Sequence, residues 1–205
     1  VKSCLAWRET ACGPLGAKTV FFIRHAEAES NAAAYQHPRD SPGYLAAYED
    51  AQFFDSLLSK TGEVQSQELA ERTKTLPCEA IICSPLRRTL QTAALALAAH
   101  LERGVPCYAV EAAREFSQGH ARPCDYRHSV EAQRASFERV DFSRVPPGED
   151  TFAARKESVE DLDLRCLDLL RLLRDLPQRQ LAVVSHTGFL THLFKSHLHW
   201  PAEQC

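Results

Sequence analysis

Methionine is absent from this sequence of 205 residues. Its first residue is therefore not an encoded start, and we expect the chain to be an excerpt or a processed product. No apolar run approaches the ~20 residues that cross a bilayer, and residues 1–18 lack the apolar stretch of a secretory signal. These absences predict a protein without a membrane partner.

The sequence also has no excess of positive charge. Its 24 lysine and arginine residues are outnumbered by 27 aspartate and glutamate residues, which gives a formal net charge of −3. A mildly acidic surface gains nothing from general binding to nucleic acid or anionic membranes, so we predict neither as a partner. The 44% hydrophobic and 25% charged residues are typical of a soluble globular domain.

The eight cysteines include no CxxC pair and have no regular spacing. Structural zinc sites need paired short spacings, so no metal site is predicted. A chain of this size does not depend on a disulfide framework, which favours reduced thiols and a cytoplasmic location. The cysteines are Cys4, Cys12, Cys78, Cys83, Cys107, Cys124, Cys166 and Cys205.

Short apolar runs alternate with helical patterns along the chain. The expected strands cover roughly residues 19–23, 79–83, 106–110 and 181–184. Helices are expected over 27–35, 62–76, 84–101, 150–176 and 189–197, with a further helix over 129–139 inside the weakly patterned stretch 114–147. Such alternation predicts an α/β fold of βαβ units. We expect one domain, a parallel sheet with helices on both faces, after an irregular lead-in over 1–17.

Charged and imidazole side chains follow three of the expected strands. Arg24 and His25 come directly after the first, and His186 comes directly after the last. Arg87 and Arg88 stand near the helix start that follows the second strand. Ligands of open α/β sheets bind at the carboxyl ends of the strands, and arginine forks and helix N-termini favour phosphate. A single histidine or arginine is more often structural, but this convergence predicts a phosphate site.

These motifs, in their order along the chain, resemble the histidine phosphatase superfamily, in its phosphoglycerate mutase-like branch. The matching patterns are RHAxxxxN at 24–31, SPLxRxxQT at 84–92, a downstream acidic residue, and SHxGFL at 185–190. The resemblance extends over residues 20–202. The stretch 114–127 is most similar to the plant and fungal phosphoglycerate mutase-like phosphatases. The implied fold is a three-layer sandwich with a mostly parallel central sheet.

The resemblance implies a role for each matching residue. His25 is the implied nucleophile, which becomes phosphohistidine, and Glu115 is the implied general acid for the leaving oxygen. His186 would donate to the phosphoryl oxygens, which Arg24 and Arg88 grip with support from Asn31; Arg87 would point outward. The chemistry agrees, because phosphoryl transfer needs positioning and charge stabilisation, and a neutral imidazole is a competent nucleophile near pH 7. The implied activity is metal-independent hydrolysis of a small phosphorylated metabolite, without a cofactor.

Several positions depart from the family pattern. Ala26 replaces the usual glycine, and Ala28 lacks a hydroxyl that would contribute about 1 kcal/mol in one hydrogen bond. The arginine pair that grips the cofactor in mutases is not evident, which favours hydrolysis. The chain also stops where the family continues into a further strand, which would expose an unpaired sheet edge.

Two alternatives stay open from the sequence. One is phosphoglycerate mutase-type phosphoryl transfer, and the other is a non-catalytic phosphate-binding or scaffold domain. The substrate is expected to contact residues 32–54 and 118–145, and the oligomeric state is open. Asp55 and Asp125 are interpreted as turn or capping residues. The remaining histidines are interpreted as surface or core residues, with attention to His120 because it lies near the expected acid. They are His37, His100, His120, His128, His192, His197 and His199.

Overall fold

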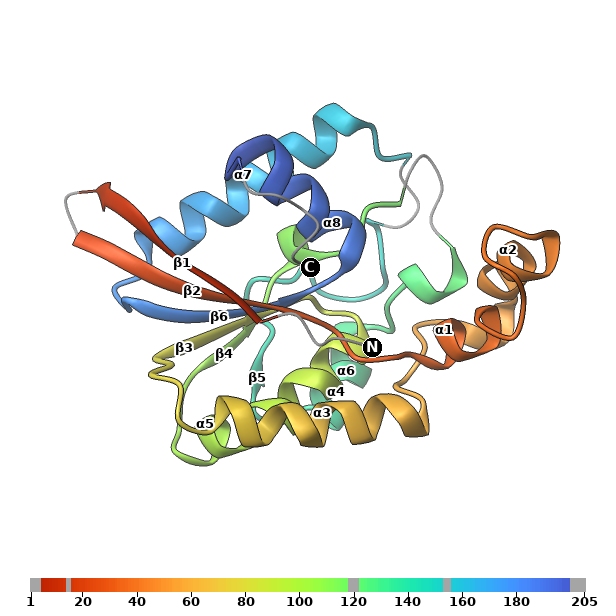
Figure 1. The fold of residues 1–205 in the computed structure, drawn as a ribbon, viewed down its shortest axis with the longest axis horizontal. Helices are drawn as coiled ribbons and strands as arrows, with labels where there is room; N and C mark the ends of the chain where they lie inside the picture. The colour runs from red at the N-terminus through yellow and green to blue at the C-terminus, as the bar shows by residue number, and fades with distance from the viewer. Residues whose placement is uncertain (1–4, 14–15, 118–121, 153–155, 200–205) are drawn as a thin grey trace.

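The computed structural model describes residues 5–13, 16–117, 122–152 and 156–199 (Figure 1). Its six-stranded sheet has the order β1-β2-β6-β3-β4-β5, in which β1 is antiparallel to β2 and the other neighbours are parallel. The strands are β1 Leu5–Gly13, β2 Gly16–Arg24, β3 Ala80–Cys83, β4 Cys107–Ala109, β5 Val140–Asp141 and β6 Gln180–Ser185. No described helix is long and apolar enough to span a bilayer.

Helices cover both faces of this sheet. The α-helices are α1 Glu29–Ala34, α2 Pro42–Glu49, α3 Lys60–Thr73, α4 Arg87–Ala96, α5 Ala98–Glu102, α6 Val130–Ser136, α7 Val159–Asp175 and α8 Thr187–His192. Shorter turns are η1 Ala51–Phe53, η2 Glu111–Ala113, η3 Pro123–Asp125 and η4 Leu193–His197, of which η4 is a π-helix. Helices α7 and α8 lie on one face, and α3, α4 and α6 lie on the other (Figure 1). The predicted three-layer α/β fold is therefore confirmed.

The two hydrophobic cores follow from the alternation of side chains along the strands. Phe22 and Val183 point to the face covered by α7 and α8, whereas Ile23 and Val184 point to the face covered by α3 and α4. Because both faces are covered, the central strands are apolar throughout, which is why short continuous runs marked them in the sequence. The described cysteines with free thiols are all buried: Cys78, Cys83, Cys107, Cys124 and Cys166.

The expected irregular lead-in over 1–17 is wrong, because Leu5–Gly13 forms β1. This strand pairs antiparallel with β2 along its outer edge, from Leu5 opposite Ile23 to Gly13 opposite Gly16. Without it the N–H and C=O groups on that edge would have no partners in the sheet. The chain thus covers this edge of β2 itself.

The helices also differ from the expectation in three places. The helix expected from 150 begins only at Val159, because Ser158 caps it in a reciprocal bond with Asp161. The single helix expected over 84–101 divides after Ala96, whose carbonyl accepts a hydrogen bond from the Thr73 hydroxyl. The structure also contains α2, which Ser41 caps and which is not among the expected helices.

The parallel register brings three loop starts to one edge of the sheet. Arg24 pairs with Ser185, and Cys83 pairs with Val184 on the other side of β6. The residues that follow these strands, His25, His186 and Ser84, therefore emerge side by side.

Candidate active site

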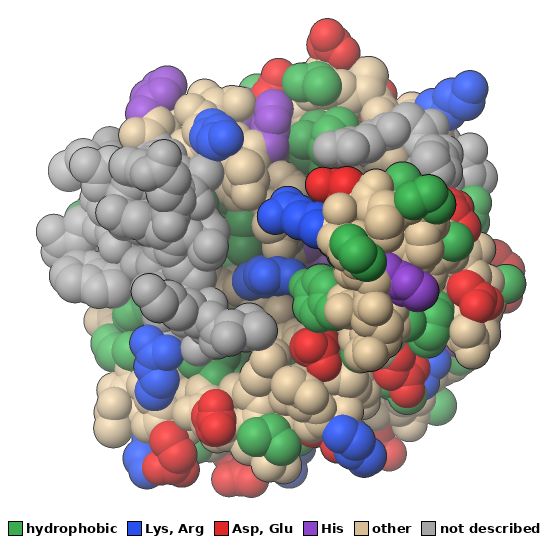
Figure 2. Space-filling model, turned by 45° about the vertical axis from the view of Figure 1, so that its right-hand side comes forward, with side chains coloured by type: hydrophobic (Ala, Val, Ile, Leu, Met, Phe, Trp, Pro, Cys, Tyr) green, Lys and Arg blue, Asp and Glu red, His purple; other side chains and the backbone are tan. Residues whose placement is uncertain are grey.

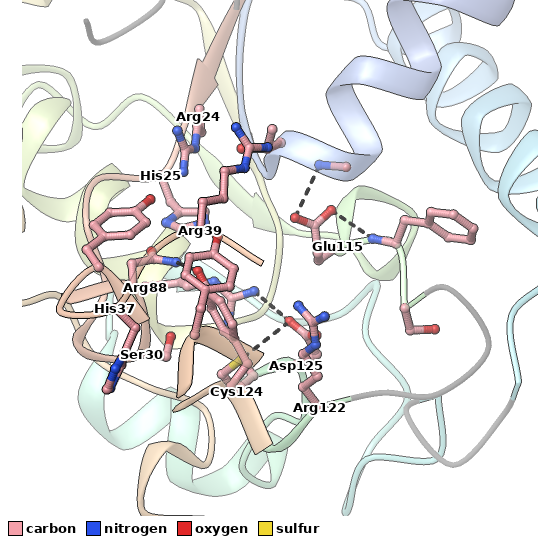
Figure 3. Close-up of a pocket in the computed structure, with 18 residues that line it drawn as sticks. Arg24, His25, Ser30, His37, Arg39, Arg88, Glu115, Arg122, Cys124 and Asp125 are labelled. Carbon is pink, nitrogen blue, oxygen red and sulfur yellow. Dashed lines mark hydrogen bonds and ion pairs between the residues drawn. The ribbon is translucent and has the colours of Figure 1, made fainter. Parts of the chain in front are cut away.

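A cavity of about 620 Å³ opens at this carboxyl edge of the sheet. Figure 2 shows the hollow on this face, with basic side chains at its rim. The cavity is lined by five of the six residues expected in the site: Arg24, His25, Asn31, Arg88 and Glu115 (Figure 3). The sixth, His186, is fully buried, with its ring centre 5.0 Å from that of His25. The structure thus brings all six together.

The backbone fixes the tautomer of His25. Its Nδ1 lies 2.7 Å from the carbonyl oxygen of Ala26, and a carbonyl can only accept, so Nδ1 carries the proton. The other ring nitrogen, Nε2, is left with its lone pair. Burial, followed by the positive charges of Arg88 and Arg24, lowers the pKa of His25 well below its ordinary value of 6.5. His25 is therefore a neutral imidazole near pH 7.

His186 stands behind His25 as a second neutral imidazole. Its pKa is also lowered well below 6.5, by burial and then by Arg88 and His25. Its Nε2 is 2.8 Å from the Ser84 hydroxyl, which itself accepts from the amide of Leu86 at 3.4 Å. This arrangement favours donation from Ser84 to Nε2, which leaves the proton of His186 on Nδ1.

Two buried donors in the site have no protein partner. They are Nδ1 of His186 and Nε of Arg24, neither of which bonds to any described residue. Buried polar atoms in native proteins nearly always have partners, so these two indicate a ligand with acceptor atoms. An anion with several oxygens, such as a phosphoryl group, has the acceptors that they require.

Arg88 is held in position by residues of η3. Its side chain is only 4% exposed; it donates through Nη1 to the Cys124 carbonyl and through Nη2 to Asp125, at 2.9 Å. Burial disfavours the charge, but Asp125 and other nearby acidic groups outweigh it and raise the pKa of Arg88. Asp125 lies in a turn, as expected, but it also lines the cavity and orients this cation. Arg88 therefore presents a fixed positive charge to the cavity.

Glu115 rests on the N-terminus of α8. Its Oε1 accepts from the amides of Phe116 at 2.8 Å and Phe189 at 2.9 Å, and its Oε2 accepts from Gly188 at 3.2 Å (Figure 3). Burial, with a further contribution from Asp125, nevertheless raises the pKa of Glu115. A carboxyl group with a raised pKa, held at the cavity wall, suits a group that must exchange a proton.

A profile of the histidine phosphatase superfamily (branch 1) matches residues 20–205. The chain belongs to this superfamily. Two curated relatives come from Arabidopsis thaliana. A phosphoglycerate mutase-like protein is 28% identical over 210 residues, covering 87% of this chain and 74% of the relative. Phosphoglycerate mutase-like protein 1 is 29% identical over 206 residues, covering 85% and 70% respectively.

Solved structures of other phosphatases share the fold. The ecdysone phosphate phosphatase from Bombix mori, in complex with tungstate, gives a TM-score of 0.62 at 16% identity, over 86% of this chain and 75% of the other. A putative α-ribazole-5'-P phosphatase from Escherichia coli gives a TM-score of 0.55 at 22% identity, over 90% of this chain and 81% of the other. At these identities the likeness supports the architecture described above.

Asn31 and Asp55 have clear roles in organising this histidine phosphatase. The Asn31 side chain accepts from the Ala28 amide and donates to the Tyr48 hydroxyl, each at 3.0 Å. Its amide nitrogen carries a second hydrogen that is available to a ligand. Asp55 is fully buried and accepts from the backbone N–H of Arg87 at the start of α4, which confirms its predicted capping role. Arg87 is half-buried and does not line the cavity.

The outer wall of the cavity is formed by residues of the two stretches, 32–54 and 118–145, in which substrate contacts were expected, but the sequence did not single out the individual residues. His37, which was predicted to be an ordinary surface or core histidine, lines this wall. Tyr44 and Tyr48 of α2 also line the cavity. The same wall includes Tyr35, Arg39, Arg122 and Cys124. His120 lies outside the described residues.

Cys124 places a thiol in the cavity wall. Burial and the neighbouring Asp125 raise the pKa of its thiol to about 12. Thiolate, not thiol, attacks electrophiles, so Cys124 is unreactive near pH 7. His25, whose Nε2 keeps its lone pair, is the nucleophile that the geometry favours.

Proposed function

We propose that this chain is a metal-independent phosphomonoester hydrolase that works through a phosphohistidine intermediate. The observation that carries the proposal is the bond from His25 Nδ1 to the Ala26 carbonyl, which leaves Nε2 unprotonated in a cavity lined by Arg24 and Arg88. A nucleophile and an anion-binding site are thereby combined in one place.

In the first step, Nε2 of His25 forms a bond to phosphorus while the bond from phosphorus to the ester oxygen breaks. Glu115 gives its proton to the departing oxygen. Arg24, Arg88 and the Nδ1–H of His186 stabilise the charge that develops on the phosphoryl oxygens. The products of this step are a free alcohol and phosphohistidine.

In the second step, water attacks the phosphorus atom of phosphohistidine. Glu115, now a carboxylate, accepts a proton from that water, and the bond from Nε2 to phosphorus breaks. Inorganic phosphate leaves, and His25 and Glu115 return to their starting protonation states. Of the side chains used, His25, Arg24, Arg88 and Glu115 line the cavity, and His186 lies directly behind His25.

The substrate is proposed to be a small phosphorylated metabolite with an organic part beyond the phosphoryl group. The cavity volume of about 620 Å³ lies within the range of ~300–1,000 Å³ that is usual for small-molecule sites. Aromatic side chains of Tyr44 and Tyr48 line its outer part and offer apolar surface to such a group. One solved phosphatase of similar fold is named an ecdysone phosphate phosphatase, and another is a phosphoserine phosphatase mutant in complex with phosphoserine, so both esters belong in a substrate panel.

The test uses a phosphate ester labelled with ³²P, with rapid quenching of the wild type, His25→Ala and, as a control in the same cavity, His37→Asn. We expect label on wild type and His37→Asn that is lost in acid and stable in base, as for a phosphoramidate, and none on His25→Ala. Absence of label on the wild type, or equal label on His25→Ala, would overturn the proposal. Label that passes to an added phosphoglycerate without release of phosphate would replace hydrolysis with mutase chemistry.

A further inference from the structure

Three metal-ligating side chains meet outside the active site, where α7 packs against η4 (Figure 1). Nε2 of His192 and Nε2 of His197 lie 2.7 Å and 3.0 Å from the same oxygen, Oδ1 of Asp163. The potential ligand atoms all lie within 4.8 Å of one another, and no other such trio occurs among the described residues. All three side chains are half-buried, and none lines the active-site cavity.

The local backbone explains how two histidines five positions apart come to face one carboxylate. Helix α8 ends at His192 and continues into the π-helix η4, in which the amide of Leu198 donates to the carbonyl of Leu193 at 3.1 Å. This wider turn returns the chain to the same side after five residues, as an α-helix would not. π-Turns of this kind often occur at functional sites.

Both supporting elements are anchored in the core. Leu193 and Phe194, between the two histidines, are 0% and 1% exposed, and Leu162, next to Asp163, is fully buried. Ligands carried on packed helices keep their positions better than ligands on loops. The trio is therefore already assembled before any ion binds.

We propose that Asp163, His192 and His197 bind a divalent transition-metal ion of the zinc class, with a fourth position open to water. Zinc binds imidazole nitrogen and carboxylate oxygen at ~2.0–2.2 Å, which in a tetrahedral site separates two ligand atoms by about 3.4 Å. The two N···O distances would each have to widen by less than about 1 Å. Rotation of the side chains can supply this shift.

The donor set selects the class of ion. Two imidazoles and one carboxylate suit zinc, cobalt or nickel, whereas magnesium and calcium prefer oxygen ligands. A carboxylate only accepts, so in the metal-free protein each Nε2 that bonds Asp163 carries a hydrogen. On metal binding each neutral imidazole would keep one proton, moved to Nδ1, and would give the lone pair of Nε2 to the ion. The bound ion would then join α7 to η4.

The experiment uses metal-free full chain and Co²⁺ or Zn²⁺ alone as probes. Asp163→Asn and His197→Gln are compared with wild type and with Asp168→Asn, a control on the same helix whose exposed carboxylate pairs with Arg171. Zn²⁺ affinity is measured by calorimetry. The visible spectrum of bound Co²⁺ reports its ligands, because thiolate ligation adds a charge-transfer band in the near ultraviolet. Melting temperatures without metal show whether the variants fold.

We expect one Zn²⁺ ion to bind wild type and Asp168→Asn with equal affinity, with a Kd at least tenfold weaker in the other two variants. Saturating Zn²⁺ should raise the melting temperature of wild type and Asp168→Asn, and should leave that of Asp163→Asn and His197→Gln unchanged. Equal affinity in all four proteins would overturn the proposal. So would a thiolate band that accounts for all bound Co²⁺, because the cysteines would then be the ligands.

Discussion

Gly188 allows a direct test of the proposed acid without changing any ionisable group. A Cβ atom added at this position would lie 2.6 Å from Oε1 of Glu115 and 3.2 Å from its carboxyl carbon. The first distance is closer than real Cβ atoms approach, so Gly188→Ala must push the carboxyl group off the N-terminus of α8. The backbone itself accepts alanine, because Gly188 does not have a positive φ.

The size of the effect follows from the bonds that would be lost. The displaced carboxyl group would lose the amides of Gly188 and Phe189, and hydrogen bonds to a charged group contribute about 1.5–3 kcal/mol each. A misplaced general acid typically costs a factor of ~10²–10⁴ in rate. Stability should change less, since alanine favours the helix by about 1 kcal/mol over glycine and partly offsets the lost bonds.

The assay compares kcat/KM for an alkyl phosphate and for p-nitrophenyl phosphate, because kcat/KM reports the step that expels the leaving group and not the later attack of water. We expect Gly188→Ala to lower kcat/KM about 100-fold or more for the alkyl ester and far less for the nitrophenyl ester, whose leaving group departs without a proton. Glu115→Gln should show the same dependence on the leaving group. As a control, Gly104→Ala should lose stability and keep kcat/KM, because Gly104 has a φ of +80° and nothing within 4 Å of its added Cβ.

The reasoning is refuted if Gly188→Ala keeps the wild-type kcat/KM on both esters while its melting temperature is unchanged. It is refuted as well if Glu115→Gln lowers kcat/KM by the same factor on both, because the effect would then not depend on protonation of the leaving oxygen. Loss of the alkyl activity alone, in both variants, can arise only from a group that protonates the leaving oxygen.

Three further results are expected. Asp125→Asn should move the alkaline limb of the pH profile of kcat/KM to lower pH. The reason is that the charge of Asp125 raises the pKa of Glu115, which must be protonated to act. An unmoved limb would contradict the assignment of Glu115 as the general acid. The acid limb of the wild type should lie below pH 6.5, since burial and then Arg88 lower the pKa of His25 and only its neutral form attacks; a limb above 6.5 counts against this nucleophile. Asp55→Ala removes the carboxylate that accepts hydrogen bonds from N–H groups of three residues. Each buried donor left without a partner costs ~1–3 kcal/mol, so the free energy of unfolding, measured in urea, should fall by about 3 kcal/mol or more. A loss below 1 kcal/mol would show that water replaces the carboxylate as acceptor.

The two histidines of the site could be predicted because short sequence patterns next to them mark their positions. His25 and His186 directly follow two apolar runs, and parallel pairing of β2 with β6 places them together. Nothing local marks Asp125 as the partner of Arg88, because the two are 37 positions apart and meet only through the loop around η3. The stretches that form the outer wall could be named, but their individual residues could not, since α2 reaches the cavity through tertiary packing.

β1 shows a different limit of sequence prediction. Leu5–Gly13 contains polar residues and lies beside a segment rich in glycine and proline, so no apolar run marks it as a strand. Its strand conformation is set by the free edge of β2, which supplies the hydrogen-bonding partners along nearly the whole length of the strand. The unpaired edge of β2 therefore determines that residues 5–13 form a strand. The sequence of these residues alone does not show this.

Buried Arg165 shows why a charge in an apolar helix face is informative. Its guanidinium group donates to the backbone carbonyls of Arg114 at 2.7 Å and Glu115 at 3.3 Å, forms an ion pair with Glu157, and lies 5.0 Å from the ring centre of Phe189. A buried ion pair seldom stabilises a fold more than apolar residues of the same size would. This pair, however, ties α7 to the backbone that carries the proposed acid and to the helix end on which its carboxyl group rests. The pair therefore fixes the position of Glu115 against α8, on which the proposed proton transfer depends.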